Sequence, residues 1–399
     1  MRKMAVPGSR SSLVTTVTLL GSATPSVESY FNAATGKYGL VTLAERYGGA
    51  VLPRVIVSDT LRAAKRGEKR SHFNKVLLDR IGEALQAGSQ AILFQNRRGF
   101  SPYVECGHCG WTANCPDCNV SLTYHKSDGS LRCHYCGYRI PVPAVCPSCG
   151  TGSLLPRGFG TEKIEQELAA IFPEAAIDRL DADTSQSAGG YRRIVEAFEQ
   201  GRTDILIGTQ IVTKGFDFGG VSLVGILNAD NLLNYPDFRA GERAFQLMTQ
   251  VGGRAGRRSE PGTVVIQTAQ PQHPVIEQVL RGDYRAMVRS QLAERRAFFY
   301  PPYCRLIAVV MRHRDKELLW RAAGAFAGSA REVFGRRLLG PEAPPVDRIR
   351  GRFLVRFLLK IERRSPSAEA KRLLQELFGR LHARAEFRSV EVAADVDPM

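Results

Sequence analysis

The sequence predicts an α/β protein: a doubly wound parallel sheet with an inserted zinc-binding module and a small C-terminal α+β domain. Three observations lead to this fold class. Short apolar runs alternate with amphipathic segments across residues 161–267, as in a parallel sheet covered by helices. Eight of the nine cysteines form CxxC pairs within residues 106–149. Beyond residue 300, strand and helix patterns resume over a length that suits a separate small domain.

Composition narrows the class of protein. A chain of 399 residues is long enough for two or three domains. Lys and Arg number 55 against 39 Asp and Glu, a formal net charge of +16. That charge favours polyanionic partners, nucleic acid first, although a generally arginine-rich proteome would also produce it. With no signal peptide and no membrane-spanning apolar run, we expect a cytoplasmic protein without membrane partners, where structural disulfides are disfavoured.

Before the cysteines, the elements follow from β-rich runs and from apolar residues at helical spacing. The run at residues 91–94 is typical of a buried parallel strand. In chain order, we predict a strand at 12–20, a helix at 27–35, short strands within 38–57, an exposed basic linker at 62–70 and a helix at 75–86.

After the cysteines, strands and helices alternate, so the zinc module is expected to interrupt the sheet between its first strand and the following helix. Helices are predicted at 161–172, 191–200 and 239–251, and strands at 176–180, 204–207, 221–227 and 262–267. A boundary is expected near Tyr300-Pro-Pro-Tyr. The C-terminal domain then has predicted strands at 305–311, 352–361 and 389–395, and helices at 317–336 and 367–385.

The CxxC pairs are the strongest chemical signal. Two cysteines three positions apart can place both sulfurs on one metal, and two pairs complete a tetrahedron, so four pairs predict two four-cysteine zinc sites. A redox CxxC motif would not need four copies. The spacing leaves open which pairs share a zinc. Because eight cysteines fill two sites, no ligand role remains for His108, His125 and His134. Cys304 is then expected to be an ordinary buried thiol. The predicted ligands are Cys106, Cys109, Cys115, Cys118, Cys133, Cys136, Cys146 and Cys149.

A glycine-hinged turn closes the helix predicted at 239–251. Arg254 and Arg257 lie three residues apart on it, and guanidinium groups suit the charge on a transferring γ-phosphoryl group. Gln250 can hydrogen-bond the same phosphate or its attacking water. These three residues are candidates for catalysis, and the alternative is a plain basic turn at a helix end.

A second candidate site follows the strand at 204–207. Thr209, Thr213 and Lys214 offer hydroxyls and a cation that suit the phosphates of a nucleic-acid backbone. Gly215 allows close approach, and Asp217 can accept from a ribose hydroxyl or position the arginines. The alternative is an ordinary exit from the carboxyl edge of a sheet, which is also where open α/β sheets bind ligands.

Two weaker motifs flank the first strands. Ser22 and Thr24, in a turn of small residues, could couple a phosphate site to a neighbouring domain. Arg97 and Arg98 follow a predicted strand and could hold DNA phosphates. Taken alone, the first is a turn and the second a solvated surface.

The order of these motifs resembles a superfamily 2 helicase. Residues 21–24 resemble motif III, residues 94–98 motif IV, residues 209–217 motif V, and residues 250–257 motif VI. Four zinc knuckles inserted after motif IV are similar to the PriA family of replication-restart helicases, also called primosomal protein N′. The resemblance covers residues 20–399, and residues 159–162, 229–239 and 395–398 also fit that family.

The resemblance implies a fold and a function. The sheet would be RecA-like, the second of two helicase motor domains, in an enzyme that uses ATP and Mg²⁺ to unwind DNA 3′→5′ at stalled forks. Forked and single-stranded DNA, primosome proteins and single-stranded-DNA-binding protein would be the partners. Cys106, Cys109, Cys146 and Cys149 would share one zinc, and the four inner cysteines the other. The C-terminal domain would bind DNA and partners.

The chain also departs from the family. It contains no Gly-x-x-x-x-Gly-Lys-Ser/Thr phosphate loop and no Asp-Glu-Glu-His box. We therefore expect the C-terminal portion of such a helicase, truncated before the phosphate loop and inactive alone as an ATPase. The alternative is a non-catalytic, zinc-dependent module that binds DNA or replication proteins; a zinc-ribbon nuclease or transcription factor fits less well.

The expected domain boundaries follow from that interpretation. The expected parts are a remnant of the first motor domain at 1–60, a linker and start of the second at 61–103, the zinc insertion at 104–150, the second motor domain at 151–300 and the C-terminal domain at 301–399.

Overall fold

The computed structural model describes residues 18–43, 52–95, 103–117, 120–125, 129–133, 136–157, 161–180, 188–209, 218–256, 261–344, 347–363 and 366–398. They belong to two compact units, residues 1–41 and residues 42–399, which are treated separately below. Among these residues, no helix combines the length and the apolar character needed to cross a bilayer.

The first unit contains one described helix, α1 (Val27–Ala34), where a helix was predicted. The Ser26 hydroxyl accepts a hydrogen bond from the Ser29 amide at 3.1 Å and so caps the helix start. The predicted strand at 12–20 is not found in its described part, residues 18–20; its other residues lie outside the described part of the chain. Leu19 and Leu20 are 85% and 71% exposed.

The second unit is built on a six-stranded sheet in the order β1-β13-β12-β4-β11-β10, in which every neighbouring pair is parallel. The central strands are apolar and buried, as expected of a sheet covered on both faces. The strands are β1 (Arg54–Asp59), β4 (Gln90–Phe94), β10 (Ile177–Leu180), β11 (Ile205–Gly208), β12 (Val221–Ile226) and β13 (Thr263–Thr268).

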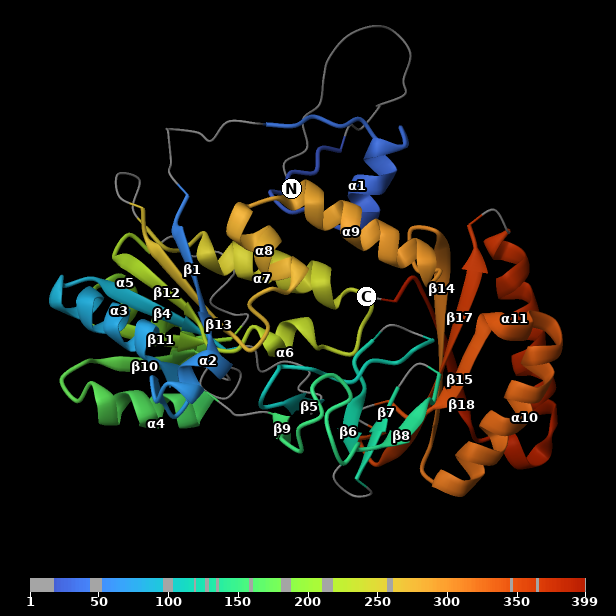
Figure 1. The fold of residues 1–399 in the computed structure, drawn as a ribbon. Helices are drawn as coiled ribbons and strands as arrows, with labels where there is room; N and C mark the ends of the chain where they lie inside the picture. The colour runs from blue at the N-terminus through green and yellow to red at the C-terminus, as the bar shows by residue number, and fades with distance from the viewer. Residues whose placement is uncertain are drawn as a thin grey trace, which may run out of the picture. The chain divides into compact units, whose positions relative to one another are not determined.

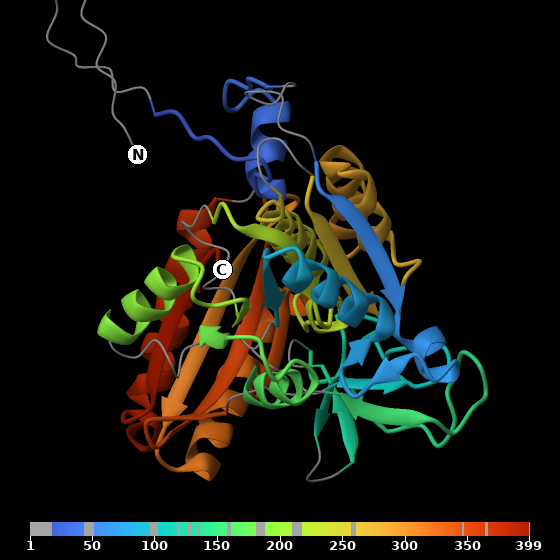
Figure 2. The same cartoon turned by 90° about the vertical axis from the view of Figure 1, so that its left-hand side faces the viewer.

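Strand β1 corrects two expectations. It pairs with β13 from Arg54 opposite Thr263, so the sheet begins earlier than the expected boundary at residue 61, and β4 is not its first strand. Figure 2 shows these distant segments side by side. The linker predicted at 62–70 is also wrong, because α2 (Thr60–Lys65) follows directly. The Asp59 carboxylate caps α2 by accepting from the amides of Leu61 and Arg62.

Helices cover the two faces of the sheet. Helix α3 (Lys75–Gln86), predicted with these bounds, and α4 (Thr161–Ile171) share one buried cluster with the sheet. Gly225 permits this close packing, because a Cβ there would lie 2.6 Å from Leu93. Helix α7 (Ala240–Gly252) packs on the sheet through β12. The remaining elements of this part are β2 (Lys69–Arg70), β3 (Phe73–Asn74), α5 (Ala188–Glu199), α6 (Asp230–Leu233), α8 (Pro274–Arg281) and α9 (Tyr284–Ala297).

The cysteine module lies between β4 and α4, as an insertion in the sheet. Its strands are very short and pair in two small antiparallel groups, β5 with β9 and β6-β7-β8. They are β5 (Tyr103–Cys106), β6 (Thr123–His125), β7 (Ser130–Arg132), β8 (Arg139–Pro141) and β9 (Leu154–Arg157).

The C-terminal domain is an antiparallel sheet in the order β15-β17-β14-β18, with β16 added on β17. Helices α10 and α11 cover one face (Figure 1). This is the predicted α+β domain, with two extra strands. Its elements are β14 (Cys304–His313), α10 (Lys316–Phe334), β15 (Leu338–Glu342), β16 (Arg348–Ile349), β17 (Arg352–Glu362), α11 (Ser367–Ala383) and β18 (Glu391–Val396).

Other residues of the C-terminal sheet pack against the cysteine module. One buried cluster, which we call the shared core, joins Leu131 of β7 to Leu306 of β14 and Leu358 of β17. The insertion therefore obtains its apolar core from the C-terminal domain. The members of the shared core are Val104, Ala113, Cys115, Val120, Leu122, Leu131, Cys133, Phe238, Tyr300, Cys304, Leu306, Ala308 and Leu358.

Truncating the shared core is expected to loosen both parts at once. Leu131 is fully buried, so Leu131→Ala should cost about 2–5 kcal/mol of unfolding free energy. Amide exchange should rise in β14 and β17 as well as in β7. Val145→Ala, at a side chain that is 53% exposed in the same module, is the control and should change stability by less than about 0.5 kcal/mol. Faster exchange confined to β6–β8 would contradict a shared core.

Candidate zinc centres and the arginine turn

The outer cysteine pairs meet in space. Cys106, Cys109, Cys146 and Cys149 have all their sulfurs within 4.8 Å of one another. The Sγ atoms of Cys106 and Cys149 are 3.6 Å apart, and those of Cys109 and Cys146 are 3.7 Å apart. Tetrahedral zinc with bonds of about 2.3 Å requires sulfurs about 3.8 Å apart. The geometry and the thiol ligands therefore fit one structural zinc.

The inner pairs form the second cluster. The sulfurs of Cys115, Cys133 and Cys136 gather within the same limit, and those of Cys115 and Cys136 are 3.6 Å apart. Cys118 lies outside the described residues. The chain therefore nests one cluster inside the other. Within the described part of the chain, no histidine joins either cluster.

Backbone turns present the sulfurs. Gly110, Gly137 and Gly150 each follow the second cysteine of a pair and adopt φ values of 75°, 84° and 74°, in the left-handed region that favours glycine. Their amides donate to the carbonyl of the first cysteine, at 2.8–3.0 Å, rather than to sulfur. Two of the amides that do reach sulfur lie two residues after a cysteine: His108 donates to Cys106 and Tyr138 to Cys136.

The thiols of the first cluster differ in acidity. Burial opposes ionisation of Cys106, but hydrogen bonds from the Thr151 hydroxyl and from the Cys109 and His108 amides lower its pKa to about 6. Burial raises the pKa of Cys109 to about 12. Hydrogen bonds with Thr151 lower the pKa of Cys149. Cys304 differs, since burial raises its pKa to about 12.

The loop that carries Cys106 and Cys109, which we call the first zinc loop, packs against the carboxyl edge of the parallel sheet. The Thr112 hydroxyl donates to the Asn234 side chain at 3.1 Å, just after α6. Gly110 packs so tightly that a Cβ would lie 2.7 Å from the Ala269 carbonyl oxygen, beyond β13. The second zinc loop meets the C-terminal domain, where Glu342 Oε2 lies 2.8 Å from the Cβ position of Gly137. Sequence patterns give no sign of these contacts.

The turn that begins at Gln250 and contains Arg254, which we call the arginine turn, lies at the opposite edge of the parallel sheet. Gln250 is exposed in the last turn of α7, and Arg254 is half-buried just beyond it. The Gly256 amide donates to the carbonyl of Val221, the first residue of β12, at 2.9 Å. Because β12 runs parallel to its neighbours, this turn lies at the amino edge of the sheet. Arg257 lies outside the described residues.

Thr209 is buried at the carboxyl end of β11, so the structure does not place it beside Arg254. Ser22 and Thr24 belong to the first unit, where the Thr24 amide donates to the Ser22 hydroxyl at 3.2 Å. The other predicted residues lie outside the described part of the chain: Arg97, Arg98, Thr213, Lys214, Gly215 and Asp217.

Substitutions at two matched glycines test whether the first zinc loop packs against the parallel sheet. Gly150→Ala meets no atom within 4 Å, so it should cost only the left-handed backbone strain, about 1–2 kcal/mol. Gly110→Ala has the same strain and also collides with the Ala269 carbonyl, which adds ~1–3 kcal/mol. Urea denaturation of both variants measures the difference. Equal losses would show that the loop is not seated on the sheet.

Metal content tests the clusters directly. We expect two zinc ions per chain by elemental analysis, and one in Cys133→Ser, because each cluster is complete without the other. A structural zinc site contributes ~10 kcal/mol to the folding of the segment that it holds, so Cys133→Ser should unfold the inner part of the insertion and leave the first cluster and the parallel sheet intact. Cys304→Ser removes a thiol from the same shared core and should keep both ions. One zinc in the native chain would refute the two-site arrangement.

Comparison with known proteins identifies the family of this chain. Residues 115–141 match the PriA DNA helicase Cys-rich region domain, residues 160–259 the helicase conserved C-terminal domain, and residues 296–399 the primosomal protein N C-terminal domain. These regions correspond to the inner cysteine pairs, to the part of the parallel sheet that contains β10, β11, β12 and α7, and to the C-terminal domain.

Curated relatives agree along nearly the whole chain. Replication restart protein PriA of Bacillus subtilis is 38% identical over 95% of this chain and 47% of its own length. The Treponema pallidum protein is 40% identical over 96% and 56%, and the Haemophilus influenzae protein 38% identical over 95% and 51%. The chain therefore belongs to the PriA family of replication restart proteins, and it spans about half the length of these relatives.

Proposed function

We propose that this chain is the DNA-engaging part of a replication-restart helicase that unwinds DNA 3′→5′ with ATP. The observation that carries the proposal is the joining of three parts in one unit. In that unit, α7 packs on a helicase-type sheet and ends in the arginine turn. The cysteine module contacts the carboxyl edge of the same sheet, and residues of the C-terminal domain complete the apolar core of the module. A stand-alone zinc domain would need neither the turn nor the sheet.

The arginine turn would supply one side of an ATP site. Arg254 and Arg257 would stabilise charge on the γ-phosphoryl group, and Gln250 would orient the phosphate or its attacking water. ATP and Mg²⁺ also need a phosphate loop and an acidic residue for the metal. The sequence contains no such loop, so the complete site requires a facing motor domain. We therefore expect negligible ATP hydrolysis by this chain alone.

The cysteine module and the C-terminal domain would engage the DNA. The formal charge of +16 suits a phosphate backbone, and Thr213, Lys214, Arg97 and Arg98 are the candidates for contacts along the strand. Thr209 is buried, so it is a weaker candidate than these four. Forked and single-stranded DNA are the proposed substrates. Primosome proteins and single-stranded-DNA-binding protein are the proposed protein partners, and the family resemblance supports them.

A second function remains open, because the sequence lacks a phosphate loop. In it, the chain is a non-catalytic, zinc-dependent module that docks on DNA or on replication proteins. The two functions differ in what a facing motor domain would do. Only the first predicts that adding such a domain, with its own phosphate loop, produces ATP hydrolysis that Arg254→Ala abolishes.

DNA binding by the 399-residue chain tests the proposed substrate. A labelled fork should bind about tenfold more tightly than an unbranched duplex of equal length in fluorescence anisotropy. Affinity should fall steeply with salt, by a log–log slope of about −0.9 for each phosphate neutralised on duplex DNA. Cys133→Ser should weaken fork binding, whereas Cys304→Ser should not. Equal affinity for fork and duplex would refute forked DNA as the preferred substrate. Robust DNA-stimulated ATP turnover would contradict the expected lack of ATP hydrolysis.

A further inference from the structure

Helix α7 connects the two edges of the parallel sheet. It begins shortly after α6, which follows the carboxyl end of β12, and ends before Gly256, which bonds to the amino end of the same strand. Its 13 residues span about 20 Å. One end of the helix therefore carries the arginine turn, and the other end lies on the side of the sheet that holds the cysteine module.

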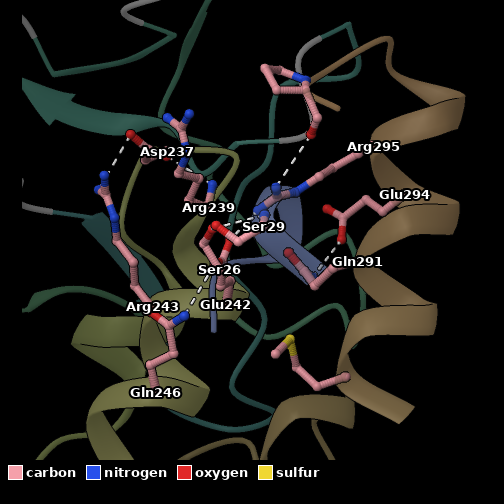
Figure 3. Close-up of polar contacts among 12 residues, drawn as sticks. Ser26, Ser29, Asp237, Arg239, Glu242, Arg243, Gln246, Gln291, Glu294 and Arg295 are labelled. Carbon is pink, nitrogen blue, oxygen red and sulfur yellow. Dashed lines mark hydrogen bonds and ion pairs between the residues drawn. The ribbon is translucent and has the colours of Figure 1, made fainter. Parts of the chain in front are cut away.

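A buried ion pair holds the first turn of α7. The Glu242 carboxylate bonds to Nη2 of Arg295, on α9, at 2.5 Å, and the two side chains are 4% and 1% exposed (Figure 3). Gln246 Nε2 donates to the other Glu242 oxygen at 3.2 Å. Arg295 Nη1 also donates to the Pro301 carbonyl at 3.3 Å, just before β14. A single guanidinium thus binds α7 to the start of the C-terminal domain.

An aromatic stack adds a second connection. The rings of Phe238 and Tyr300 lie 4.3 Å apart and almost parallel, at 2°. The guanidinium of Arg295 lies 5.1 Å from the Phe238 ring centre. On the other side, Lys360 of β17 places its Nζ 3.8 Å from the Tyr300 ring centre and donates to the Phe298 carbonyl at 2.9 Å. Cation–π and stacking contacts therefore run from β17 to the start of α7.

A third connection comes from the end of the chain. Arg239, the residue before α7, lies over the Phe238 ring at 4.3 Å and donates through Nη1 to the Pro398 carbonyl at 3.1 Å. The Asp397 amide in turn donates to the Leu306 carbonyl of β14 at 2.8 Å. Three separate segments of the C-terminal domain are thus connected to the same end of α7, through Arg295, through Tyr300 and through Arg239.

We propose that Phe238, Glu242 and Arg295 are positioning residues through which the C-terminal domain sets the placement of the arginine turn. A buried ion pair and a ring stack fix an orientation better than apolar contacts alone, because both lose energy when their geometry changes. Because an α-helix is stiff, a shift of its first turn also displaces its last turn. The significance of the turn for ATP rests on the proposed function, whereas the mechanical connection does not.

The test perturbs the C-terminal domain and measures the turn. Lys360→Met keeps the length of the side chain and removes its charge, far from residues 248–256 in the fold. Hydrogen exchange of the native full chain, followed by mass spectrometry, should become several-fold faster at residues 248–256 in this variant and stay unchanged in β4. Lys371→Met removes an exposed lysine from α11 of the same domain and should change nothing at 248–256.

Lys360→Met is then combined with a second substitution that breaks the connection between β17 and α7. In Phe238→Leu the stack is lost, so adding Lys360→Met should produce no further change at residues 248–256. Phe238→Tyr keeps the ring and should restore the native response, which a general loss of stability would not do. Should Phe238→Leu fail to fold, Phe238→Met takes its place, because methionine also removes the ring stack and its flexible side chain fills core space more completely.

The outcomes are decisive in either direction. An equal response to Lys360→Met in the native and the interrupted backgrounds, or no response at all, overturns the proposal. Fork affinity, measured on the same variants, reports separately on the proposed function. A chain that binds no fork but shows the non-additive exchange would retain the connection and lose the proposed substrate.

Discussion

Strands of three or four residues have too few hydrogen bonds and apolar contacts to fold alone, and the insertion between β4 and α4 consists of such strands. Thiolate coordination supplies what they lack. Each cluster fixes turns from two distant parts of the insertion at one point, with sulfurs spaced as tetrahedral zinc requires. The loops that result then contact both the parallel sheet, at Asn234, and the C-terminal domain, at Glu342. If zinc occupies these clusters, as we propose, the placement of the C-terminal domain would depend on metal coordination in another part of the chain.

The shared core gives this dependence a second basis. Leu131, Leu306 and Leu358 belong to one apolar cluster although they come from two domains. Two of the cysteines in that cluster, Cys115 and Cys133, also belong to the second candidate metal cluster. Loss of metal and loss of apolar packing are therefore not independent events here. The sheet cluster around Leu77 and Leu93 is separate from the shared core, which explains why the parallel sheet can persist when the insertion does not.

Local patterns predicted much of the fold, and their failures have physical causes. The helix at 75–86 was found with its bounds because apolar residues recur at helical spacing; Leu77 and Ile81 of the predicted face are buried, whereas Val76 is exposed. Strand β1 was missed as part of the sheet because its partner, β13, lies more than half the chain away, and register between distant strands leaves no local trace. Helix α8 could have been found, since Pro274 at its start and Gly282 at its end are standard signals.

The candidate sites divide in the same way. CxxC spacing identifies the ligand type, but which pairs share a metal depends on the path of the chain between them. The arginine turn was recognised from its sequence, whereas its position at the amino edge of the sheet follows from one backbone hydrogen bond, Gly256 to Val221. The junction of Phe238, Glu242 and Arg295 combines side chains from distant segments, and no motif of one segment contains it.

The pairing of β1 with β13 has a consequence for synthesis on the ribosome. Arg54 leaves the ribosome long before Thr263, its partner, so the sheet stays open through most of translation. The eight proposed zinc ligands are complete at Cys149, well before that. The metal clusters can therefore form while β1 and β4 still await their neighbours. The apolar residues of the insertion must then wait longer, until β14 and β17 emerge to cover them. During that interval we expect the nascent chain to expose Leu131 and its neighbours to solvent.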